Sequence, residues 1–245
     1  MNFSVVIISK NAEATIQKVV TAILDLSDDV IIVDSGSTDS TLSILNNFPV
    51  TVISTSWRGY GATKNIGNKA AKHAWILSLD ADEVVDEQLK AFLKKMDWEN
   101  SNLVGRIKRK NFIGDQWIKY GEWSHDSSLR FFNKSFACWD TAAVHEKLQF
   151  KDSPLVKNIS GSMLHYTATT LEQYRIKVFA YARLSAVANS NNQAAAFKKY
   201  ASPVVGFIKN YIFKLGFLDG RIGLRLALTN AKYRYLKYCI PEKQH

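Results

Sequence analysis

Hydrophobic residues fall into two recurring patterns over the first hundred positions. Short runs of β-branched and other apolar residues are typical of strands buried on both faces. They alternate with stretches in which apolar residues recur at helical spacing. The runs cover residues 3–9, 30–33, 50–54 and 75–79, and the helical stretches cover residues 13–26, 39–47, 62–73 and 86–96. This alternation predicts an α/β fold with an open, mainly parallel central sheet and helices on both of its faces.

The rest of the chain follows two other patterns. Residues 104–166 combine short strand-like pieces with aromatic residues and turns, which indicates an antiparallel addition to the sheet. From residue 170 onward the apolar spacing is helical again. We therefore expect a helical extension at the C-terminal end.

The net charge of +10 is concentrated in the last part of the 245-residue chain. Residues 1–150 hold 17 Lys and Arg against 18 Asp and Glu, whereas residues 151–245 hold 15 against 4. Such an excess suits an anionic membrane surface, an anionic acceptor molecule or nucleic acid, and the alternative is a solvated basic face. Aromatic and aliphatic residues lie among the basic ones over 203–240, which favours helices at a membrane interface.

Cysteine content and hydropathy indicate a cellular location. Cys138 and Cys239 have no metal-ligand spacing and form no disulfide framework, so a reducing cytoplasm is expected. The N-terminal apolar run lacks the charged region of a signal peptide, and no stretch reaches the ~18 apolar residues of a spanning helix. The sequence therefore predicts a cytoplasmic protein that is not integral to a membrane.

Carboxylates follow two of the predicted strands. Asp80 and Asp82 come directly after the run 75–79, and ligands of parallel sheets bind outside the carboxyl ends of the strands. Two carboxylates two residues apart can face one hard cation, and Mg²⁺ or Mn²⁺ is often held by one or two carboxylates together with substrate phosphates. The alternative is that these acids cap the next helix, which Asp86 can also begin.

Asp34 closes the second run, ahead of Gly36, which permits a tight turn. Its carboxylate can accept hydrogen bonds from a uracil or a ribose, or it can form an Asx turn into a capped helix, and both can hold together. The chain has neither the glycine-rich dinucleotide fingerprint nor a P-loop. Carboxylates and a metal ion would therefore have to hold any nucleotide.

These motifs resemble family 2 glycosyltransferases of the GT-A fold. Residues 4–11, 33–39 and 79–83 are similar to that superfamily's first, second and metal-binding motifs, in the same order. The likeness narrows to the branch of lipopolysaccharide-core β-1,4-glucosyltransferases that act on inner-core heptose. The segments that carry this narrower likeness are 57–61 with Lys64-Asn65, 121–123, Asp126 with 129–132, 144–146, 164–167 and 215–221.

The resemblance implies a division of the chain. Residues 1–168 would form the GT-A catalytic domain, with the nucleotide sugar bound by 1–100 and the acceptor by 101–168. Residues 169–245 would be the basic helical extension.

The resemblance also implies donor and metal sites. Asp34 would hold the nucleoside, Asp80 would lie near the ribose and the metal, and Asp82 would bind the divalent cation directly. His165 is a further candidate metal or diphosphate ligand, with a structural role as the alternative. The family often has a second Asp where this chain has Ser35, and this departure concerns how the nucleobase of the donor would be recognised. The other residues expected at the nucleotide sugar are Ser9, Asn11, Arg58, Lys64 and Ala81.

The general base has two candidates. An inverting transfer needs a carboxylate that takes the acceptor proton, and the resemblance favours Asp126, with Glu146 as the alternative. The structural readings are a salt bridge from Asp126 to Arg130 and a surface carboxylate at Glu146 steadied by His145 or Lys147. Trp123, His145 and Arg130 are expected on the acceptor side.

The resemblance implies transfer of a hexose, with glucose from UDP-glucose inferred from the branch, to a hydroxyl of a lipopolysaccharide or lipooligosaccharide inner core. A glycolipid acceptor suits a peripheral position on the cytoplasmic face of the inner membrane. The alternatives are another nucleotide sugar for a different envelope glycan, a sugar nucleotidyltransferase, and a non-catalytic nucleic-acid-binding protein. The chain lacks the glycine-rich loop of nucleotidyltransferases after its first strand and lacks a known nucleic-acid motif, so we expect no nucleic-acid partner.

Overall fold

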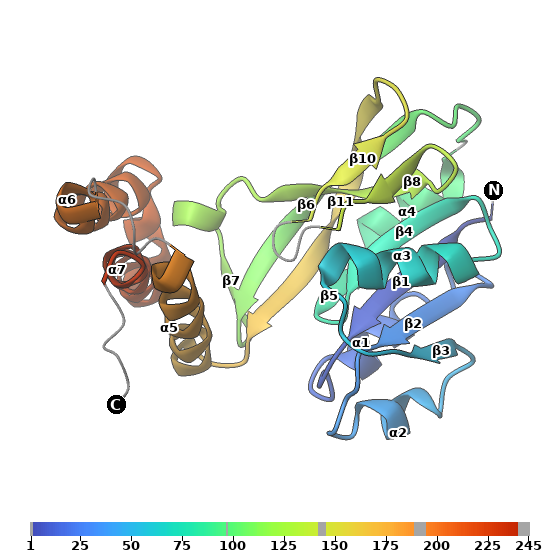
Figure 1. Cartoon of the computed structure of the whole chain (residues 1–245). Coiled ribbons are helices and arrows are strands. Elements are labelled where there is room, and N and C mark those ends of the chain that lie inside the picture. Colours follow the sequence, from blue (N-terminus) through green and yellow to red (C-terminus); the bar gives the residue numbers. More distant parts are fainter. Residues whose placement is uncertain (1, 97, 142–145, 189–194, 240–245) are drawn as a thin grey trace. The chain divides into compact units, whose positions relative to one another are not determined.

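The chain forms two compact units, seen in a computed structural model (Figure 1). The first, here called the sheet unit, comprises residues 1–109 and 127–165, and the second, here called the helical unit, comprises residues 110–126 and 166–245. The structure describes residues 2–96, 98–141, 146–188 and 195–239.

Four parallel strands make up the first half of the sheet, as the apolar runs predict. They are β1 (Ser4–Ser9), β2 (Val30–Asp34), β3 (Thr51–Ser54) and β4 (Trp75–Asp80), in the order β3-β2-β1-β4. Every residue of β1 and β2 is buried. Burial on both faces explains why these strands are continuous apolar runs, without the alternation of a half-exposed strand.

Helices pack on both faces of these strands, with α3 in front of the sheet and α4 behind it in Figure 1. Gly67 brings α3 close to the sheet, because a Cβ at this position would overlap the side chain of Val6. The first predicted helix is shorter than expected: residues 12–15 form a turn in which the carbonyl of Ala12 accepts from both Thr15 and Ile16. The bounds are α1 (Ile16–Thr21), α2 (Thr41–Leu45), α3 (Tyr60–Ala70) and α4 (Glu87–Lys95).

The predicted antiparallel addition extends the sheet beyond β4. Its strands are β6 (Leu103–Ile113), β7 (Gln116–Ile118), β8 (Ser127–Asn133) and β11 (Leu155–Ala168), and a short strand that the sequence pattern does not predict, β5 (Glu83–Val85), joins the same sheet. The order continues β4-β8-β6-β11-β5, and β7 pairs with β6. A separate two-stranded sheet joins β9 (Ala137–Trp139) to β10 (Leu148–Phe150). The sheet is therefore mixed, with a parallel half that carries the predicted strand ends.

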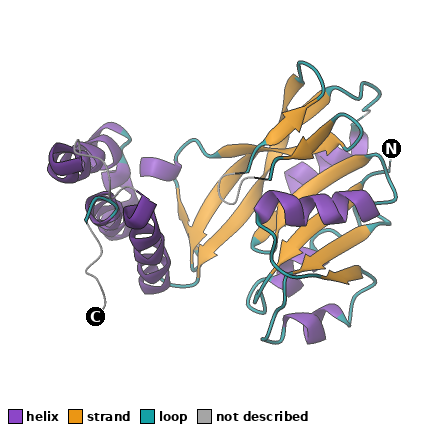
Figure 2. Cartoon of the chain, in the orientation of Figure 1, coloured by secondary structure: helices purple, strands orange, loops and turns teal. Residues whose placement is uncertain are grey.

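Most of the described residues after Thr170 are helical, as predicted (Figure 2). A small apolar core of Ile113, Ile118, Tyr174 and Leu226 holds the helical unit together. None of the helices described here combines the length and apolar character needed to cross a bilayer. The elements are η1 (Gly121–Trp123), α5 (Leu171–Ala188), α6 (Ala195–Ile208), η2 (Lys209–Phe213), η3 (Gly216–Asp219) and α7 (Gly220–Leu236).

Candidate active site

Polar side chains gather at the carboxyl ends of three neighbouring strands of the sheet unit. The register pairs Ser9 at the end of β1 with Asp34 at the end of β2, and pairs Ile8 with Asp80 at the end of β4. Because neighbouring strands lie about 4.8 Å apart, the Cα atoms of Asp34 and Asp80 are separated by roughly 10 Å. The predicted acids therefore share one edge of the sheet.

Asp34 is buried and organises the turn that follows β2. Its Oδ1 accepts from the backbone N–H groups of Gly36 (3.0 Å) and Ser37 (2.8 Å), and its Oδ2 accepts from the Ser37 hydroxyl (2.6 Å). Gly36 has a φ of 84°, which favours glycine. The Asx turn considered from the sequence is present, and it fixes the orientation of the carboxylate.

The loop after β1 is tied to this turn. Asn11 has a φ of 50°, its backbone N–H donates to the Ser37 hydroxyl (2.8 Å), and its side-chain Oδ1 accepts from the backbone of Thr38 (2.8 Å). Arg58 lies exposed in the loop between β3 and α3, next to the exposed ring of Trp57. These two loops border the strand ends with hydrogen-bonding and cationic groups.

Asp80 is held between two cations from distant parts of the chain. Its Oδ1 lies 3.1 Å from Nζ of Lys64, and its Oδ2 accepts from Nη2 of Arg130 at 2.8 Å. Burial alone would raise the pKa of Asp80, but the charges of Arg130 and Lys64 outweigh it and hold the pKa well below its ordinary value. Asp80 is therefore a carboxylate at every physiological pH.

Arg130 links Asp80 to another carboxylate, that of Glu83, which is fully buried. The same Nη2 donates to Oε1 of Glu83 (2.9 Å), and Nη1 of Arg109 lies 3.3 Å from that oxygen. Burial by itself would lower the pKa of Arg130, but Asp80 and Glu83 raise it above its ordinary value. The other guanidinium nitrogen, Nη1, is buried and has no partner among the described residues.

Lys64 also pairs with Glu146, the alternative base. Its Nζ lies 2.6 Å from Oε1 of Glu146 and 4.7 Å from the ring centroid of Trp139. The side-chain amide of the neighbouring Asn65 donates through Nδ2 to the Trp139 carbonyl (2.8 Å) and accepts through Oδ1 from the Trp139 backbone N–H (3.0 Å), which fixes α3 against this segment. Glu146 is therefore not a free surface carboxylate. His145, considered as a residue that steadies it, lies outside the described residues.

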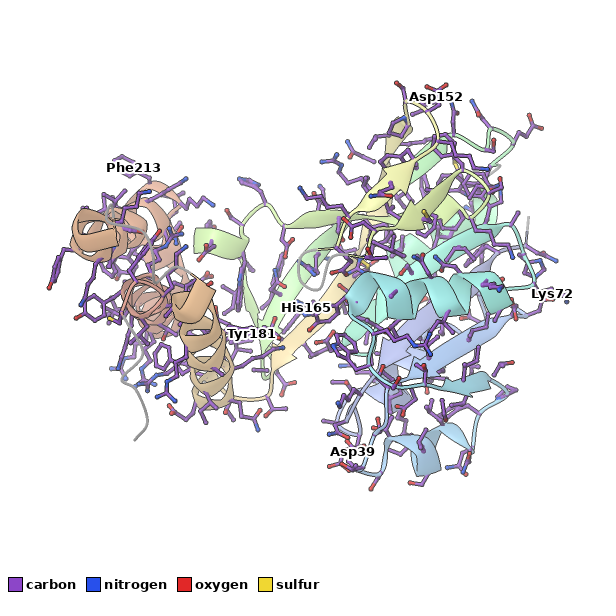
Figure 3. The ribbon with its side chains drawn as sticks, in the orientation of Figure 1. Asp39, Lys72, Asp152, His165, Tyr181 and Phe213 are labelled. Carbon is purple, nitrogen blue, oxygen red and sulfur yellow. The ribbon has the colours of Figure 1, made fainter. Side chains whose placement is uncertain are left out.

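Asp82 and His165 lie together beside this cluster. The register of β5 and β11 pairs Glu83 with His165, and Oδ2 of Asp82 is 3.4 Å from Nε2 of the histidine, which Figure 3 labels on β11. Both side chains are partly exposed. The carbonyl of Ala81 accepts from the Thr15 hydroxyl (2.7 Å), which anchors the turn between the two aspartates. No group of three or more acidic, His or Cys side chains in the described residues could by itself hold a metal ion.

Two other predicted residues belong to the helical unit. Asp126 accepts from Nδ2 of the buried Asn111 at 2.9 Å, while Arg130, considered as its salt-bridge partner, pairs with the two carboxylates named above. Trp123 packs edge-on against Tyr174, with ring centroids 5.3 Å apart, and joins the apolar core of this unit.

Three residues without a predicted role contact the candidate site residues. Glu83 is completely buried, Arg109 pairs with it, and Asn111 holds Asp126. The sequence signal for Glu83 is weak: it is a charged residue directly ahead of the apolar pair Val84-Val85, which can indicate a buried ion pair.

Comparisons with known proteins point to one family. The family model described as glycosyl transferase family 2 matches residues 4–164. The chain is 26% identical to the lipopolysaccharide core biosynthesis glycosyltransferase LpsC of Rhizobium meliloti, over 95% of this chain and 89% of that protein. It is also 26% identical to an uncharacterized glycosyltransferase of Rickettsia typhi, over 96% of this chain and 84% of that one.

Solved structures with weaker overall similarity include S. aureus TarS, with a TM-score of 0.46, 17% identity and coverage of 97% of this chain and 55% of that chain. Another is glucosyl-3-phosphoglycerate synthase from Mycobacterium tuberculosis, with a TM-score of 0.37, 23% identity and coverage of 45% and 44%. The fold predicted from the sequence, a GT-A fold with a C-terminal helical region, is confirmed. With the family model covering most of its length, the chain belongs to glycosyl transferase family 2.

Proposed function

We propose that the chain is a metal-dependent inverting glycosyltransferase that moves a hexose from a nucleoside diphosphate to a hydroxyl of a lipopolysaccharide or lipooligosaccharide inner-core acceptor. UDP-glucose is the proposed donor and a heptose the proposed acceptor sugar. The observation that carries the proposal is the strand-end cluster, in which Asp80 sits between Lys64 and Arg130 beside the Asp82–His165 pair. The relative whose name specifies lipopolysaccharide core biosynthesis supports the acceptor class.

The domain roles follow from this assignment. Residues 1–168 would be the catalytic domain, in which 1–100 bind the nucleotide sugar and 101–168 bind the acceptor, and 169–245 would be a basic helical extension. The family match to residues 4–164 supports a catalytic domain that ends near residue 168.

Donor binding would use the polar groups at the strand ends. Asp34, fixed by its turn, would accept hydrogen bonds from the nucleoside, and Lys64, which is buried and paired with Asp80 and Glu146, would contribute positive charge on the diphosphate side of the site. Asp80 would lie near the ribose. Loop and turn groups that border the same edge complete the proposed donor set: Ser9, Asn11, Arg58 and Ala81.

A divalent cation fits the groups beside Asp80. A carboxylate oxygen and an imidazole nitrogen can bind the same divalent cation, and Asp82 Oδ2 and His165 Nε2 lie 3.4 Å apart. Asp82 would therefore be the direct ligand, with His165 beside it, and Asp80 would stay with its two cations. When bound, Mg²⁺ or Mn²⁺ would neutralise charge on the diphosphate leaving group.

The transfer would break the bond between the anomeric carbon and the diphosphate oxygen while the acceptor oxygen bonds to that carbon from the opposite side. The acceptor proton would pass to Asp126, which Asn111 orients through a 2.9 Å hydrogen bond. Glu146 is the alternative base, but its ion pair with Lys64 supports a role in positioning that lysine.

The acceptor side is proposed to include Trp123, His145 and Arg130. The burial of Arg130 and its bonds to two carboxylates support a positioning role on Asp80 over direct contact with a sugar. A glycolipid acceptor would place the enzyme peripherally on the cytoplasmic face of the inner membrane, against an anionic surface.

A transfer assay tests the proposal. The full chain would be incubated with UDP-glucose or other nucleotide sugars, a heptose-terminated inner-core acceptor, and Mn²⁺, Mg²⁺ or a chelator, and both free UDP and the anomeric configuration of the product would be measured. We expect acceptor-dependent UDP release that the chelator abolishes, and a product of inverted configuration. Pyrophosphate exchange would instead support a nucleotidyltransferase, and release with another nucleotide sugar would support the alternative donor.

The assignment of Asp126 as the general base is tested in the same assay. Asp126→Asn should lower kcat by about 10²- to 10⁴-fold, the usual contribution of a general base, with UDP affinity unchanged. Asp115→Asn, which removes an exposed carboxylate from the β6–β7 turn, is the matched control and should leave kcat unchanged. A full loss of kcat in Glu146→Gln with normal UDP affinity, together with an active Asp126→Asn, would reverse the assignment.

A further inference from the structure

Large apolar side chains are exposed on one segment of the helical unit, from the end of α6 to η3. Phe213 is 78% exposed, and Figure 3 shows it at the surface of this unit. An exposed group of this kind marks an interaction site in a folded protein. The 204–218 surface, as it is called below, includes Val204, Val205, Ile208, Ile212, Phe213 and Leu218, which are 38–78% exposed.

Helical geometry places Val204, Ile208 and Ile212 on one side of the chain. Positions 204, 208 and 212 recur every four residues, which aligns them along a single stripe. Gly206 and Asn210, on the other side, are buried, and a Cβ at Gly206 would contact Arg234 of α7. Among the described residues, the apolar stripe is therefore the exposed face of this segment, while Gly206 on the opposite face packs against α7.

The turn after η2 is fixed to its surroundings. The backbone N–H of Gly121 donates to the carbonyl of Lys214 (2.9 Å). The carboxylate of Asp219 accepts from the backbone N–H groups of Lys119 (3.2 Å) and Tyr120 (2.9 Å). These bonds join residues 119–121 to Lys214 and Asp219, and they fix the chain between η2 and α7.

Basic residues lie in and just after the segment 204–218 in the sequence. Lys209 and Arg221 are exposed, and Lys214 is half-buried. The one acidic residue in the sequence from 195 to 239 is Asp219, whose carboxylate is bonded to the backbone as described. Lysine is depleted in the centres of protein–protein interfaces, whereas apolar and aromatic side chains flanked by lysine and arginine are typical of helices that lie in a bilayer interface.

We propose that the 204–218 surface inserts into the headgroup region of an anionic lipid bilayer, with Phe213 and Leu218 entering the acyl boundary and Lys209, Lys214 and Arg221 binding lipid phosphates. The inference deepens the proposed function, since it names the surface through which an enzyme with a glycolipid acceptor meets its membrane. It concerns binding alone and needs neither donor nor metal.

Vesicle flotation of the full chain tests this surface, with phosphatidylcholine vesicles that contain or lack phosphatidylglycerol. Binding is expected only with the anionic lipid. Phe213→Ser should reduce the partition coefficient by at least about tenfold, the effect of removing one large apolar group from burial. Lys209→Ser and Lys214→Ser should each reduce it about fivefold, as expected for one basic residue at an anionic surface.

Two control variants lie in the sheet unit. Leu155→Ser removes an apolar side chain that is 55% exposed, and Lys151→Ser removes an exposed lysine. Both should bind vesicles like the unchanged chain. Transfer to a short water-soluble acceptor should be the same in Phe213→Ser as in the parent, and loss of that transfer in every protein would count against the proposed function while leaving the vesicle result intact.

Two outcomes would overturn the inference. The first is vesicle binding that Phe213→Ser and the lysine variants leave unchanged. The second is self-association of the chain in sedimentation equilibrium that Phe213→Ser abolishes, without binding to vesicles, which would make the 204–218 surface an interface between two copies.

Discussion

Replacing Arg130 by Met tests the charged network beneath the candidate site. Arg130 is almost fully buried and pairs with both Asp80 and Glu83. Removal of one member of a buried ion pair costs about 3–5 kcal/mol, because the remaining charge stays buried without its partner. Two features place the effect at the lower end: Asp80 is 28% exposed, and Glu83 keeps Arg109 at 3.3 Å.

A loss of about 3 kcal/mol corresponds to a fall in Tm of roughly 6–12 °C for a chain of this size. Urea unfolding followed by tryptophan fluorescence would measure it, since Trp75 and Trp98 are buried against Phe131 in the sheet unit. Arg109→Met is the matched control. The contact of that arginine with Glu83 is longer, at 3.3 Å, and its side chain is more exposed, so its removal should cost about 1 kcal/mol or less.

The cost of Arg130→Met should also depend on pH. The folded-state pKa of Asp80 lies below the ordinary value of 3.8, so this ion pair stabilises the fold fully above that pH and progressively less as the pH falls toward the folded-state pKa. The Arg130→Met variant lacks the stabilisation that the ion pair between Arg130 and Asp80 provides. The free-energy difference from the parent should therefore be constant from about pH 7 to about pH 5 and shrink below about pH 4. A difference under 1 kcal/mol at neutral pH, or one no larger than that of Arg109→Met, would refute the reasoning.

Two further predictions concern packing in each unit. Gly67→Ala should lower the free energy of unfolding by about 1–2 kcal/mol, since overlap with Val6 outweighs the gain in helix propensity, and an increase in the urea midpoint would contradict this. Tyr174→Phe removes a buried hydroxyl that donates to Oδ1 of Asn230 at 2.9 Å. It should cost about 1–2 kcal/mol by thermal unfolding, and an unchanged Tm would show that the bond contributes nothing.

The parallel half of the sheet could be predicted because its signal is local. Strands buried on both faces must be apolar throughout, so β1, β2 and β4 are visible as runs, and the acids Asp34 and Asp80 follow at their ends. The first helix was overestimated because its apolar spacing continues beyond Thr21, while backbone turns end the helix there. Periodicity indicates which residues face the core, but it does not fix where the hydrogen-bonding pattern changes.

The partners of the acids could not be predicted from local patterns. Asp80 binds Arg130, fifty positions further along the chain, because β4 pairs with β8. Asp82 meets His165 because β5 pairs with β11 in one particular register. A shift of one residue in either pairing would turn these side chains to the opposite face. Such registers depend on the packing of the whole sheet, which a single sequence does not display.

The central claim is that a nucleoside diphosphate and a divalent cation bind together beside Asp82. Isothermal titration of UDP, with Mn²⁺ or with a chelator, measures it directly. We expect UDP to bind about 5- to 150-fold more tightly with Mn²⁺, and UDP to raise the affinity for Mn²⁺ by the same factor, as linkage requires. Asp82→Asn should abolish this coupling, while Asp152→Asn, a change at an exposed carboxylate between β10 and β11, should preserve it. Tight UDP binding that is indifferent to the chelator, or coupling that survives in Asp82→Asn, would contradict the account.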